Sequence, residues 1–341
     1  MNDRKLKIAV VGAGKAGAAH GAAFCACGRA EVVRVVSRTR ESARRLAEAL
    51  PGASYGTDLD EALEDPRVDA LVVASPDALH HPQTLAALKK GKHVLVEKPM
   101  CRTEGEAREM IAAARDGGLV LMAGFVERFN HPFAEAKRRI LAGEIGRPVM
   151  ILARRCHGKA VVRGRGWLND GETGGVLSYA GTHNIDLIRW FMDSPVRRVY
   201  SESGRLVLPP EQRFTDCAVM TFLFANGGIA ALYESFAYPD NLPQNVDRSI
   251  EILGEAGCIK VDMLDQPLVV YGSGNPVLGD SVTWPHFGGI IGGAVLNQAR
   301  SFAACVLDGL PVPTPGEAGL EAVRIAAAAA EAARTGRAVE L

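Results

Sequence analysis

Residues 8–17 run Ile8-Ala9-Val10-Val11-Gly12-Ala13-Gly14-Lys15-Ala16-Gly17, a short apolar strand candidate that leads directly into a GxGxxG motif. In this context the first glycine turns the chain, the second lets backbone N–H groups approach a pyrophosphate, and the third lets the following helix pack closely on the strand. The helix N-terminus adds partial positive charge. A glycine-rich turn without a ligand is the competing interpretation, but a β-α-β unit follows. The motif therefore predicts a dinucleotide site formed by Gly12, Ala13, Gly14, Lys15, Ala16 and Gly17.

Strand-like and helix-like segments alternate through the first third of the chain. Apolar runs predict strands at 7–11, 32–37, 70–74, 93–97 and 119–123, with helices near 15–28, 41–50, 58–64, 79–90 and 103–116. Thr103 followed by Glu106 forms a capping box, and Gly117-Gly118 ends that helix. Alternation of this kind with Val/Ile/Leu-rich strands is typical of a parallel sheet that is covered on both faces.

The pattern changes after about residue 125. Helices are predicted near 132–142, 181–193, 293–308 and 316–334, and strands at 148–156, 196–203, 216–225, 228–237, 247–254 and 257–263. Asn226-Gly227-Gly228 is typical of a tight hairpin, and consecutive strands without intervening helices indicate an antiparallel sheet. We therefore expect an α/β protein in which residues 1–125 form a Rossmann domain with a parallel sheet. Residues 126–341 would form an α+β domain for substrate binding and oligomerisation, with an open, mainly antiparallel sheet.

Composition narrows the functional classes. The 341 residues exceed what one hydrophobic core normally serves, which favours two domains. Lys plus Arg and Asp plus Glu number 39 each, so no basic field predicts nucleic acid or a membrane surface as a partner. No apolar run approaches the ~20 residues of a membrane span, and no signal segment is evident. Seven cysteines without a CxxC pair predict free thiols in a reducing compartment, hence a cytoplasmic protein.

The end of the second strand bears on cofactor choice. An NAD enzyme usually places Asp or Glu here to bind the ribose 2′-hydroxyl, whereas this chain has Ser37-Arg38. A carboxylate would repel a 2′-phosphate, while a hydroxyl and a guanidinium would bind it. We therefore favour NADP(H) over NAD(H), with Ser37 and Arg38 as the contacts, and keep NAD(H) as the alternative.

A more specific motif ends the fifth predicted strand: Gly91-Lys92-His93-Val94-Leu95-Val96-Glu97-Lys98-Pro99. Together with the glycine motif, this Glu-Lys-Pro sequence resembles the glucose–fructose oxidoreductase / inositol dehydrogenase (Gfo/Idh/MocA) family. Matching features continue along nearly the whole chain: His20, Ser75-Pro76-Asp77-Ala78-Leu79-His80, Gly143–Pro148, Gly174-Gly175, His183-Asn184-Ile185-Asp186 and the closing helix over Gly319–Gly336. The resemblance implies a Rossmann domain followed by an open sheet whose exposed face forms oligomer contacts. It also allows a cis bond before Pro99.

Lys98 and His183 are the predicted catalytic pair. Ligands of parallel sheets bind beyond the carboxyl ends of the strands, where Lys98 emerges. Its ammonium can stabilise negative charge on a substrate oxygen. His183, in a stretch that resembles the family's catalytic helix, can accept and return the hydroxyl proton because imidazole titrates near neutrality. Asp186 lies three residues later, so it could orient the imidazole or bind a substrate hydroxyl.

Tyr179 departs from the family pattern, because family dehydrogenases for cyclic polyols usually carry Asp four residues before the histidine. Tyr179 could donate a hydrogen bond to the substrate oxygen, relay a proton, or only line the pocket. The resemblance also implies that Ser75, Pro76, His80 and Glu97 contact the cofactor with Lys98.

Two further residues are candidates for substrate contact. Arg163 and Trp167 lie in a loop rich in glycine and arginine, and such side chains suit phosphate groups and sugar faces. A solvated loop is the alternative. No metal is expected, since His80, His81, His131 and His157 lack ligand spacing.

These observations predict an NAD(P)-dependent dehydrogenase or reductase that interconverts a secondary alcohol and a ketone on a sugar, amino sugar or cyclitol. Two alternatives remain: a redox-neutral enzyme that oxidises transiently and cleaves a glycosidic substituent, and a non-catalytic dinucleotide-sensing regulator. The uncovered strand-rich region 196–263 further predicts a homo-oligomer, a dimer or a tetramer.

Overall fold

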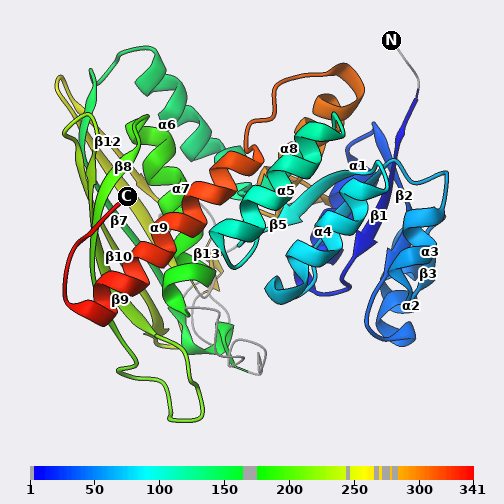
Figure 1. Ribbon diagram of the computed structural model, residues 1–341, viewed down its shortest axis with the longest axis horizontal. Coiled ribbons are helices and arrows are strands. Elements are labelled where there is room, and N and C mark those ends of the chain that lie inside the picture. The colour runs from blue at the N-terminus through cyan, green and yellow to red at the C-terminus, as the bar shows by residue number, and fades with distance from the viewer. Residues whose placement is uncertain (1–3, 164–174, 243–245, 265–268, 271–276, 279–282) are drawn as a thin grey trace. The chain divides into compact units, whose positions relative to one another are not determined.

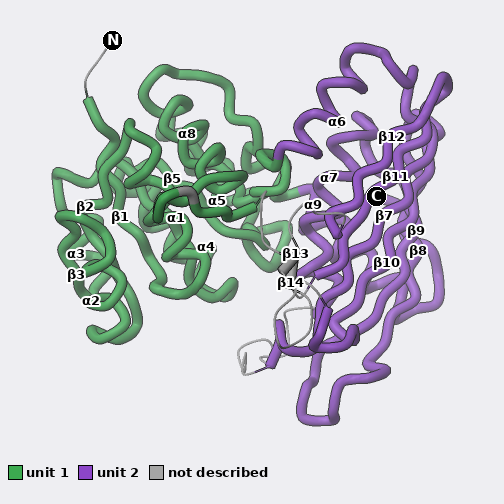
Figure 2. Tube along the Cα trace, turned by 180° about the vertical axis from the view of Figure 1, so that it is seen from behind, with its two compact units in different colours: residues 1–130, 282–320 green, residues 131–281, 321–341 purple. Residues whose placement is uncertain are grey.

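The computed structural model describes residues 4–163, 175–242, 246–264, 269–270, 277–278 and 283–341. The chain divides into two compact units, which Figure 2 distinguishes by colour. Unit 1 comprises residues 1–130 and 282–320, and unit 2 comprises residues 131–281 and 321–341. Each unit has its own sheet, as the change of sequence pattern predicts.

Unit 1 contains a six-stranded parallel sheet (Figure 1). Its strands lie in the order β3-β2-β1-β4-β5-β6, and every neighbouring pair is parallel. The order reverses direction at β1, so the carboxyl ends of β1 and β4 flank the switch point where doubly wound sheets bind ligands. The strands are β1 (Leu6–Val11), β2 (Ala30–Val36), β3 (Ser54–Gly56), β4 (Ala70–Val73), β5 (His93–Glu97) and β6 (Leu121–Gly124).

Helices connect these strands and enclose the sheet. Alternate residues Leu6, Ile8 and Val10 of β1 join a core that also contains residues of α1, α2 and α8. Within it Phe24 and Phe302 meet edge to face with ring centroids 5.9 Å apart. The helices of unit 1 are α1 (Lys15–Ala26), α2 (Arg40–Glu48), α3 (Leu59–Glu64), α4 (His80–Lys89), α5 (Glu104–Asp116) and α8 (Gly293–Asp308), with short 3₁₀ turns η1 (Asp77–Leu79) and η2 (Val126–Phe129).

The sequence predicts one contiguous second domain over residues 126–341, whereas the structure assigns residues 282–320 to unit 1. The reason is packing along the first sheet: α8 packs against α1. The segment after α8 also extends the edge strand, because the Ala123 N–H donates to the Thr314 carbonyl at 2.8 Å and the Thr314 hydroxyl donates to the Ala123 carbonyl at 2.7 Å. An apolar helix pattern does not reveal which core the helix joins.

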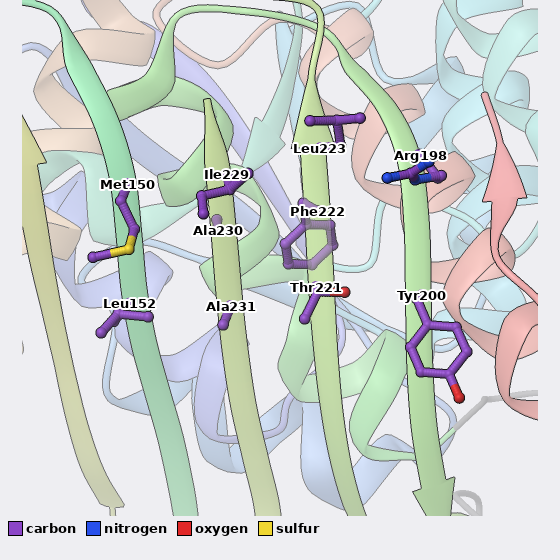
Figure 3. Close-up of a pocket in the computed structure, with 10 residues that line it drawn as sticks. All are labelled: Met150, Leu152, Arg198, Tyr200, Thr221, Phe222, Leu223, Ile229, Ala230 and Ala231. Atoms are coloured by element: carbon purple, nitrogen blue, oxygen red, sulfur yellow. The ribbon is translucent and has the colours of Figure 1, made fainter. Parts of the chain in front are cut away.

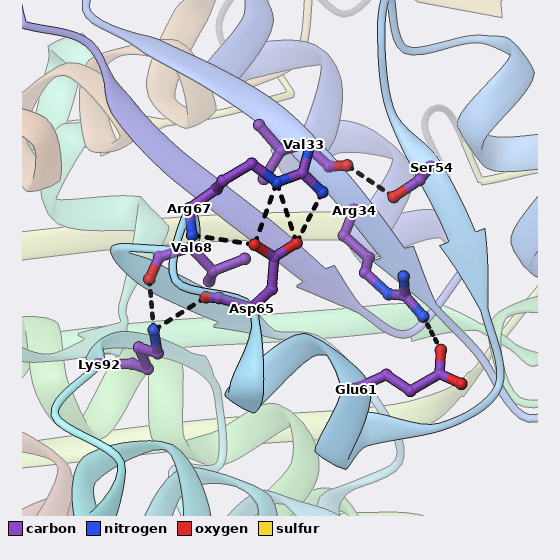
Figure 4. Close-up of polar contacts among 8 residues, drawn as sticks. All are labelled: Val33, Arg34, Ser54, Glu61, Asp65, Arg67, Val68 and Lys92. Atoms are coloured by element: carbon purple, nitrogen blue, oxygen red, sulfur yellow. Dashed lines mark hydrogen bonds and ion pairs between the residues drawn. The ribbon is translucent and has the colours of Figure 1, made fainter.

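Ion pairs tie down the loop between α3 and β4, as Figure 4 shows. The Asp65 carboxylate accepts hydrogen bonds from the Arg67 guanidinium and main chain, which lower its pKa to about 2. The Lys92 ammonium donates to the carbonyls of Asp65 (3.1 Å) and Val68 (2.7 Å). These contacts join the starts of β4 and β5, the two strands whose far ends lead to Ser75 and Glu97.

Unit 2 contains a seven-stranded mixed sheet in the order β12-β11-β7-β10-β9-β8-β17. All of its neighbouring pairs are antiparallel except β7 and β10, which run parallel. β9 and β10 form the hairpin predicted at Asn226-Gly227-Gly228. The strands are β7 (Pro148–Gly158), β8 (Val196–Gly204), β9 (Cys217–Phe224), β10 (Ile229–Tyr238), β11 (Val246–Gly254), β12 (Cys258–Asp262) and β17 (Val339–Glu340).

The two faces of this second sheet differ. α7 (Gly181–Met192) packs against β7 and β10, where Met220, Leu232 and Ile250 are buried. The opposite face exposes Leu152, Val219, Ile229, Tyr233 and Leu253. The remaining elements are α6 (His131–Leu141), the 3₁₀ turn η3 (Lys159–Val161), the π-helical turn η5 (Val176–Ala180), α9 (Gly316–Thr335), in which the division between units falls, and the paired two-residue strands β13 (Val269–Val270) with β14 (Val277–Leu278) and β15 (His286–Phe287) with β16 (Ile290–Ile291).

The predicted architecture, a parallel Rossmann sheet followed by an open, mainly antiparallel sheet, is confirmed. The predicted helices and strands recur with ends shifted by one or two residues, and the capping box of Thr103 and Glu106 is present. The prediction missed β3, which has three residues, and the two-residue strands β13, β14, β15, β16 and β17, all of which are too short to show a period. Among the described residues, no helix combines the length and apolar character needed to cross a membrane.

Candidate active site

The glycine motif forms an anion cradle at the end of β1. A Cβ on Gly12, whose φ is +105°, would lie 2.4 Å from the Ala74 carbonyl oxygen, and one on Gly17 would lie 1.9 Å from the Gly12 carbonyl oxygen. Those two glycines are required by close packing. A Cβ on Gly14 would meet nothing within 4 Å, so the second glycine faces open space. Gly14 is also the N-cap of α1 and provides no side-chain cap, which leaves the first-turn N–H groups for a ligand. The cradle fits a pyrophosphate.

Lys15 is the first residue of α1, and its ammonium lies over the face of the Trp284 ring, which belongs to the second segment of unit 1. Its ammonium is 4.8 Å from the centroid of the Trp284 indole. This is a cation–π distance, so the indole holds the lysine at the edge of the cradle. Lys15 thus belongs both to the glycine motif and to a cation–π pair with Trp284, a pairing that the sequence did not indicate.

Ser37 and Arg38 directly follow β2. The Ser37 hydroxyl accepts a hydrogen bond from the Ser42 hydroxyl at 2.9 Å, and Thr39 caps α2 by accepting from the Ser42 N–H. Arg38 is exposed, and within the described ranges its guanidinium has no ion pair. Arg40 stacks on Tyr55, with its guanidinium carbon 5.3 Å from the ring centroid. A hydroxyl and two guanidiniums thus lie near the end of β2.

The Glu97-Lys98-Pro99 loop follows β5, and the bond before Pro99 is cis. The Glu97 carboxylate lies 2.7 Å from Nε2 of His20 and accepts from the Lys98 main-chain N–H at 3.1 Å. Burial acts to raise the pKa of the Glu97 carboxyl. The His20 hydrogen bond and the charges of His20 and Lys98 outweigh it, so the net pKa lies below its usual value. Glu97 is therefore a carboxylate directed at α1 and at the main chain of Lys98.

His80, the first residue of α4, contacts the same loop at Pro99. Its Nδ1 lies 2.7 Å from the Pro99 carbonyl oxygen and its Nε2 lies 2.9 Å from the Ser75 carbonyl oxygen, with only 2% of the residue exposed. Burial lowers the pKa of His80 against the opposing effect of the two carbonyls. The ring thus bridges the segment after β4 and the segment after β5. The Ser75 hydroxyl itself donates to Gln83 Oε1 at 2.7 Å.

His183 lies in the first turn of α7 in unit 2. The π-helical turn η5 precedes this helix and begins after Gly175, whose φ is +54° and whose Cβ would lie 2.3 Å from the Thr215 carbonyl oxygen. Only glycine fits there. His183, Asn184 and Asp186 are all buried, with 8%, 1% and 1% exposed. The sequence motif thus corresponds to a single buried helical turn.

Tyr179 occupies the turn η5, one turn before His183. Its ring lies 6.4 Å from the Phe236 ring, and the rings of His157 and Phe214 also surround Phe236 at 5.7 Å and 6.0 Å. Tyr179 is therefore part of an aromatic cluster rather than an isolated polar residue at this position.

Sequence reasoning missed a charged row on the inward face of the second sheet. Glu234 of β10 is paired in register with Arg155 of β7, and Arg155 with Arg248 of β11. All three are buried, and the Arg155 guanidinium donates to Asn184 Oδ1 at 3.4 Å. A Cβ on Gly181, the first residue of α7, would lie 2.9 Å from a Glu234 carboxylate oxygen. The sequence signal was the charge at inward positions of otherwise apolar alternating strands.

The remaining candidates are less informative. Arg163 is exposed and pairs with Asp240 at 2.6 Å, while Trp167 lies outside the described residues. Among the described side chains, no group of three or more His, Cys, Asp or Glu residues could hold a metal ion.

Comparison with known proteins matches two family models to this chain. The first, described as an oxidoreductase family with an NAD-binding Rossmann fold, covers residues 6–125. The second, described as the C-terminal alpha/beta domain of the same family, covers residues 137–341. Both are Gfo/Idh/MocA models, so the match covers both sheets.

Individual relatives agree with this match. The chain is 27% identical to scyllo-inositol 2-dehydrogenase (NAD(+)) of Bacillus subtilis (99% of this chain, 97% of the relative). It is 31% identical to D-glucoside 3-dehydrogenase of Escherichia coli (70% and 72%). A crystal structure of GenD2 from gentamicin A biosynthesis, in complex with NAD, superposes with a TM-score of 0.85 at 28% identity (99% and 97%). The chain is therefore an oxidoreductase of the Gfo/Idh/MocA family, with an NAD-binding Rossmann domain and a C-terminal α/β domain.

Proposed function

We propose that the protein interconverts a secondary alcohol and a ketone on a sugar, amino sugar or cyclitol with a nicotinamide dinucleotide. The observation that carries this proposal is the Lys98 loop: a part-buried carboxylate accepts from its main chain at the carboxyl end of β5, in the same parallel sheet whose β1 leads into an anion cradle that is open at Gly14. The relatives that act on scyllo-inositol and D-glucosides support a polyhydroxylated substrate.

Residues of the chain have separable roles in this reaction. The dinucleotide supplies the hydride acceptor or donor when bound. Lys98 donates a hydrogen bond to the substrate oxygen and stabilises the negative charge that develops there. His183 Nε2 or Nδ1 takes the hydroxyl proton during oxidation and returns it during reduction. Asp186 hydrogen-bonds substrate or imidazole, and Tyr179 forms an aromatic wall of the pocket.

For the cofactor, we infer a preference for NADP(H) over NAD(H). Ser37 and Arg38 provide a hydroxyl and an exposed guanidinium near the end of β2, and Arg40 lies on the Tyr55 ring. These groups suit a 2′-phosphate. Ser75 and Pro76, which directly follow β4, stay proposed cofactor contacts, and Arg163 and Trp167 stay proposed substrate contacts.

The test of this function is a dinucleotide titration followed by a panel of sugars, amino sugars and cyclitols, monitored at the absorbance band of reduced nicotinamide. A dehydrogenase releases one reduced dinucleotide for each substrate oxidised. A redox-neutral glycoside-cleaving enzyme yields cleaved glycoside without net reduction, and a regulator binds dinucleotide without turnover. Either of those results would replace the proposal.

A homo-oligomer is also proposed, formed through the open face of the second sheet. Figure 3 shows a hollow on this face, with Leu152, Tyr200 and Ile229 among its lining residues. A contiguous apolar face on four neighbouring strands calls for a covering partner, and a second copy offers the same face. Leu152→Glu should shift the mass from light scattering toward the monomer. Leu141→Glu, at a 71% exposed position on α6, should not. A monomeric wild type would refute the proposal.

The seven free thiols fit a cytoplasmic location.

A further inference from the structure

Two buried histidines contact the loop that carries Lys98, one at Glu97 before the lysine and one at Pro99 after it. His20 comes from α1 and His80 from α4, and each is 2% exposed. Neither is directed at solvent: one contacts the Glu97 carboxylate and the other contacts main-chain carbonyls. Burying an imidazole is costly unless it is hydrogen-bonded, so the contact of His20 Nε2 to Glu97 and the two ring contacts of His80 define where these side chains lie.

The His20 side is a relay of contacts from the dinucleotide helix to Lys98. His20 Nε2 and the Glu97 carboxylate lie 2.7 Å apart, and the other carboxylate oxygen accepts from the Lys98 N–H at 3.1 Å. One carboxylate oxygen therefore contacts α1, and the other contacts the Lys98 main chain. A side chain held at both ends is poorly suited to serve as a ligand of the cofactor.

We propose that His20 and Glu97 are positioning residues that fix the Lys98 main chain relative to the glycine-motif helix, while His80 of α4 contacts Pro99, the next residue of the loop. The inference rests on the proposed function in so far as Lys98 acts on the substrate. It assigns Glu97 to the support of Lys98 instead of to the cofactor. A reactive group displaced by about 1 Å can lose up to ~10²-fold in rate, so such support acts on turnover.

Glu97→Gln and His20→Leu are the test variants. Each should lower kcat by about tenfold or more at saturating dinucleotide while the Kd for the dinucleotide stays within about twofold. His20→Gln keeps an N–H donor and should recover part of the loss, which a purely steric role would not give. The matched control is the surface pair His81 and Glu109, 2.9 Å apart, where His81→Leu and Glu109→Gln should leave kcat unchanged.

Hydrogen exchange at the Lys98 amide provides a readout that needs no substrate. This N–H should exchange at least about tenfold faster in Glu97→Gln than in wild type or Glu109→Gln, because its charged acceptor is lost. A tenfold weaker dinucleotide Kd with unchanged kcat would make Glu97 a cofactor ligand and overturn the proposal. Unchanged exchange in Glu97→Gln would overturn it as well. If the wild type oxidises no polyol, the proposed function fails, and the exchange result still decides the role of the pair.

Discussion

The Glu97-Lys98-Pro99 loop is held by contacts to main-chain atoms, whereas the first turn of α7 lies over charged side chains of neighbouring strands. In the loop, Glu97 accepts from the Lys98 N–H and His80 contacts the Pro99 carbonyl. Beneath α7, Glu234, Arg155 and Arg248 form a buried row. Hydrogen bonds thus determine where the backbone of Lys98 lies, whereas buried charges determine the electrostatic environment of the turn that carries His183. The positions of the two proposed catalytic residues therefore depend on different interactions.

The largest expected effect comes from the proposed catalytic side chains themselves. Lys98→Ala and His183→Ala should each lower kcat by about 10²–10⁴-fold with dinucleotide binding retained, because both act mainly in the transition state. Stopped-flow absorbance of reduced nicotinamide measures the loss. Near-full turnover in His183→Ala would show that His183 is not the proton acceptor. Of the two regions compared, only the Lys98 loop would then take part in catalysis.

The charged row predicts a large effect on stability. Glu234→Gln should destabilise unit 2 by about 3–5 kcal/mol, because it leaves buried guanidiniums with less compensating charge. Thermal unfolding followed by circular dichroism measures the shift. Glu251→Gln removes a carboxylate from a surface pair with Lys260 at 3.1 Å on the same sheet and should cost at most about 1 kcal/mol. Equal changes in unfolding temperature in the two variants would show that the Glu234 charge contributes no more to stability than the charge of a surface ion pair.

The cofactor preference should respond to a smaller change. Ser37→Asp with Arg38→Ala should weaken NADP(H) binding by at least about 1.4 kcal/mol, a tenfold change, through lost phosphate contacts and new repulsion. Fluorescence titration of both dinucleotides gives the two Kd values. Tighter binding of NAD(H) than NADP(H) by the wild type would contradict the preference.

The smallest effect is expected at Tyr179. Its ring packs on Phe236, so Tyr179→Phe keeps this contact and should lower kcat by less than about tenfold. A loss equal to that of His183→Ala would instead make the Tyr179 hydroxyl the proton donor in place of the aspartate that the family resemblance leads one to expect at this position. Steady-state kinetics on the same substrate distinguishes the two roles.

The same comparison explains what the sequence could predict. The glycine motif, the capping box and the Glu-Lys-Pro motif are local, so the sequence, with the family resemblance for the last of them, located Gly12 after β1, Thr103 before α5 and Lys98 after β5. The two histidines that contact the neighbours of Lys98, His20 and His80, could be noted in the sequence, but their contacts to Glu97 and Pro99 depend on how α1 and α4 pack.

The charged row and the assignment of α8 are harder to predict, because both depend on sheet register and on tertiary packing. Glu234 and Arg155 are 79 residues apart in the sequence and become neighbours only when β10 pairs in parallel with β7. Likewise, the apolar pattern of α8 predicts a helix but not that Phe302 meets Phe24 in the first core. Local periodicity carries no information on either pairing.

Single-turnover hydride transfer in Lys98→Ala, His183→Ala and the double variant tests the central claim most directly, namely that both residues act on the same substrate oxygen. Groups that act as a unit give strongly non-additive losses. The dinucleotide and a polyol that the wild type oxidises are both saturating. Hydride transfer in the double variant should therefore be no more than about tenfold slower than in the slower single variant. If the fold-loss in the double variant instead equalled the product of the two single losses, the two residues would contribute independently. That result would contradict action on a shared oxygen.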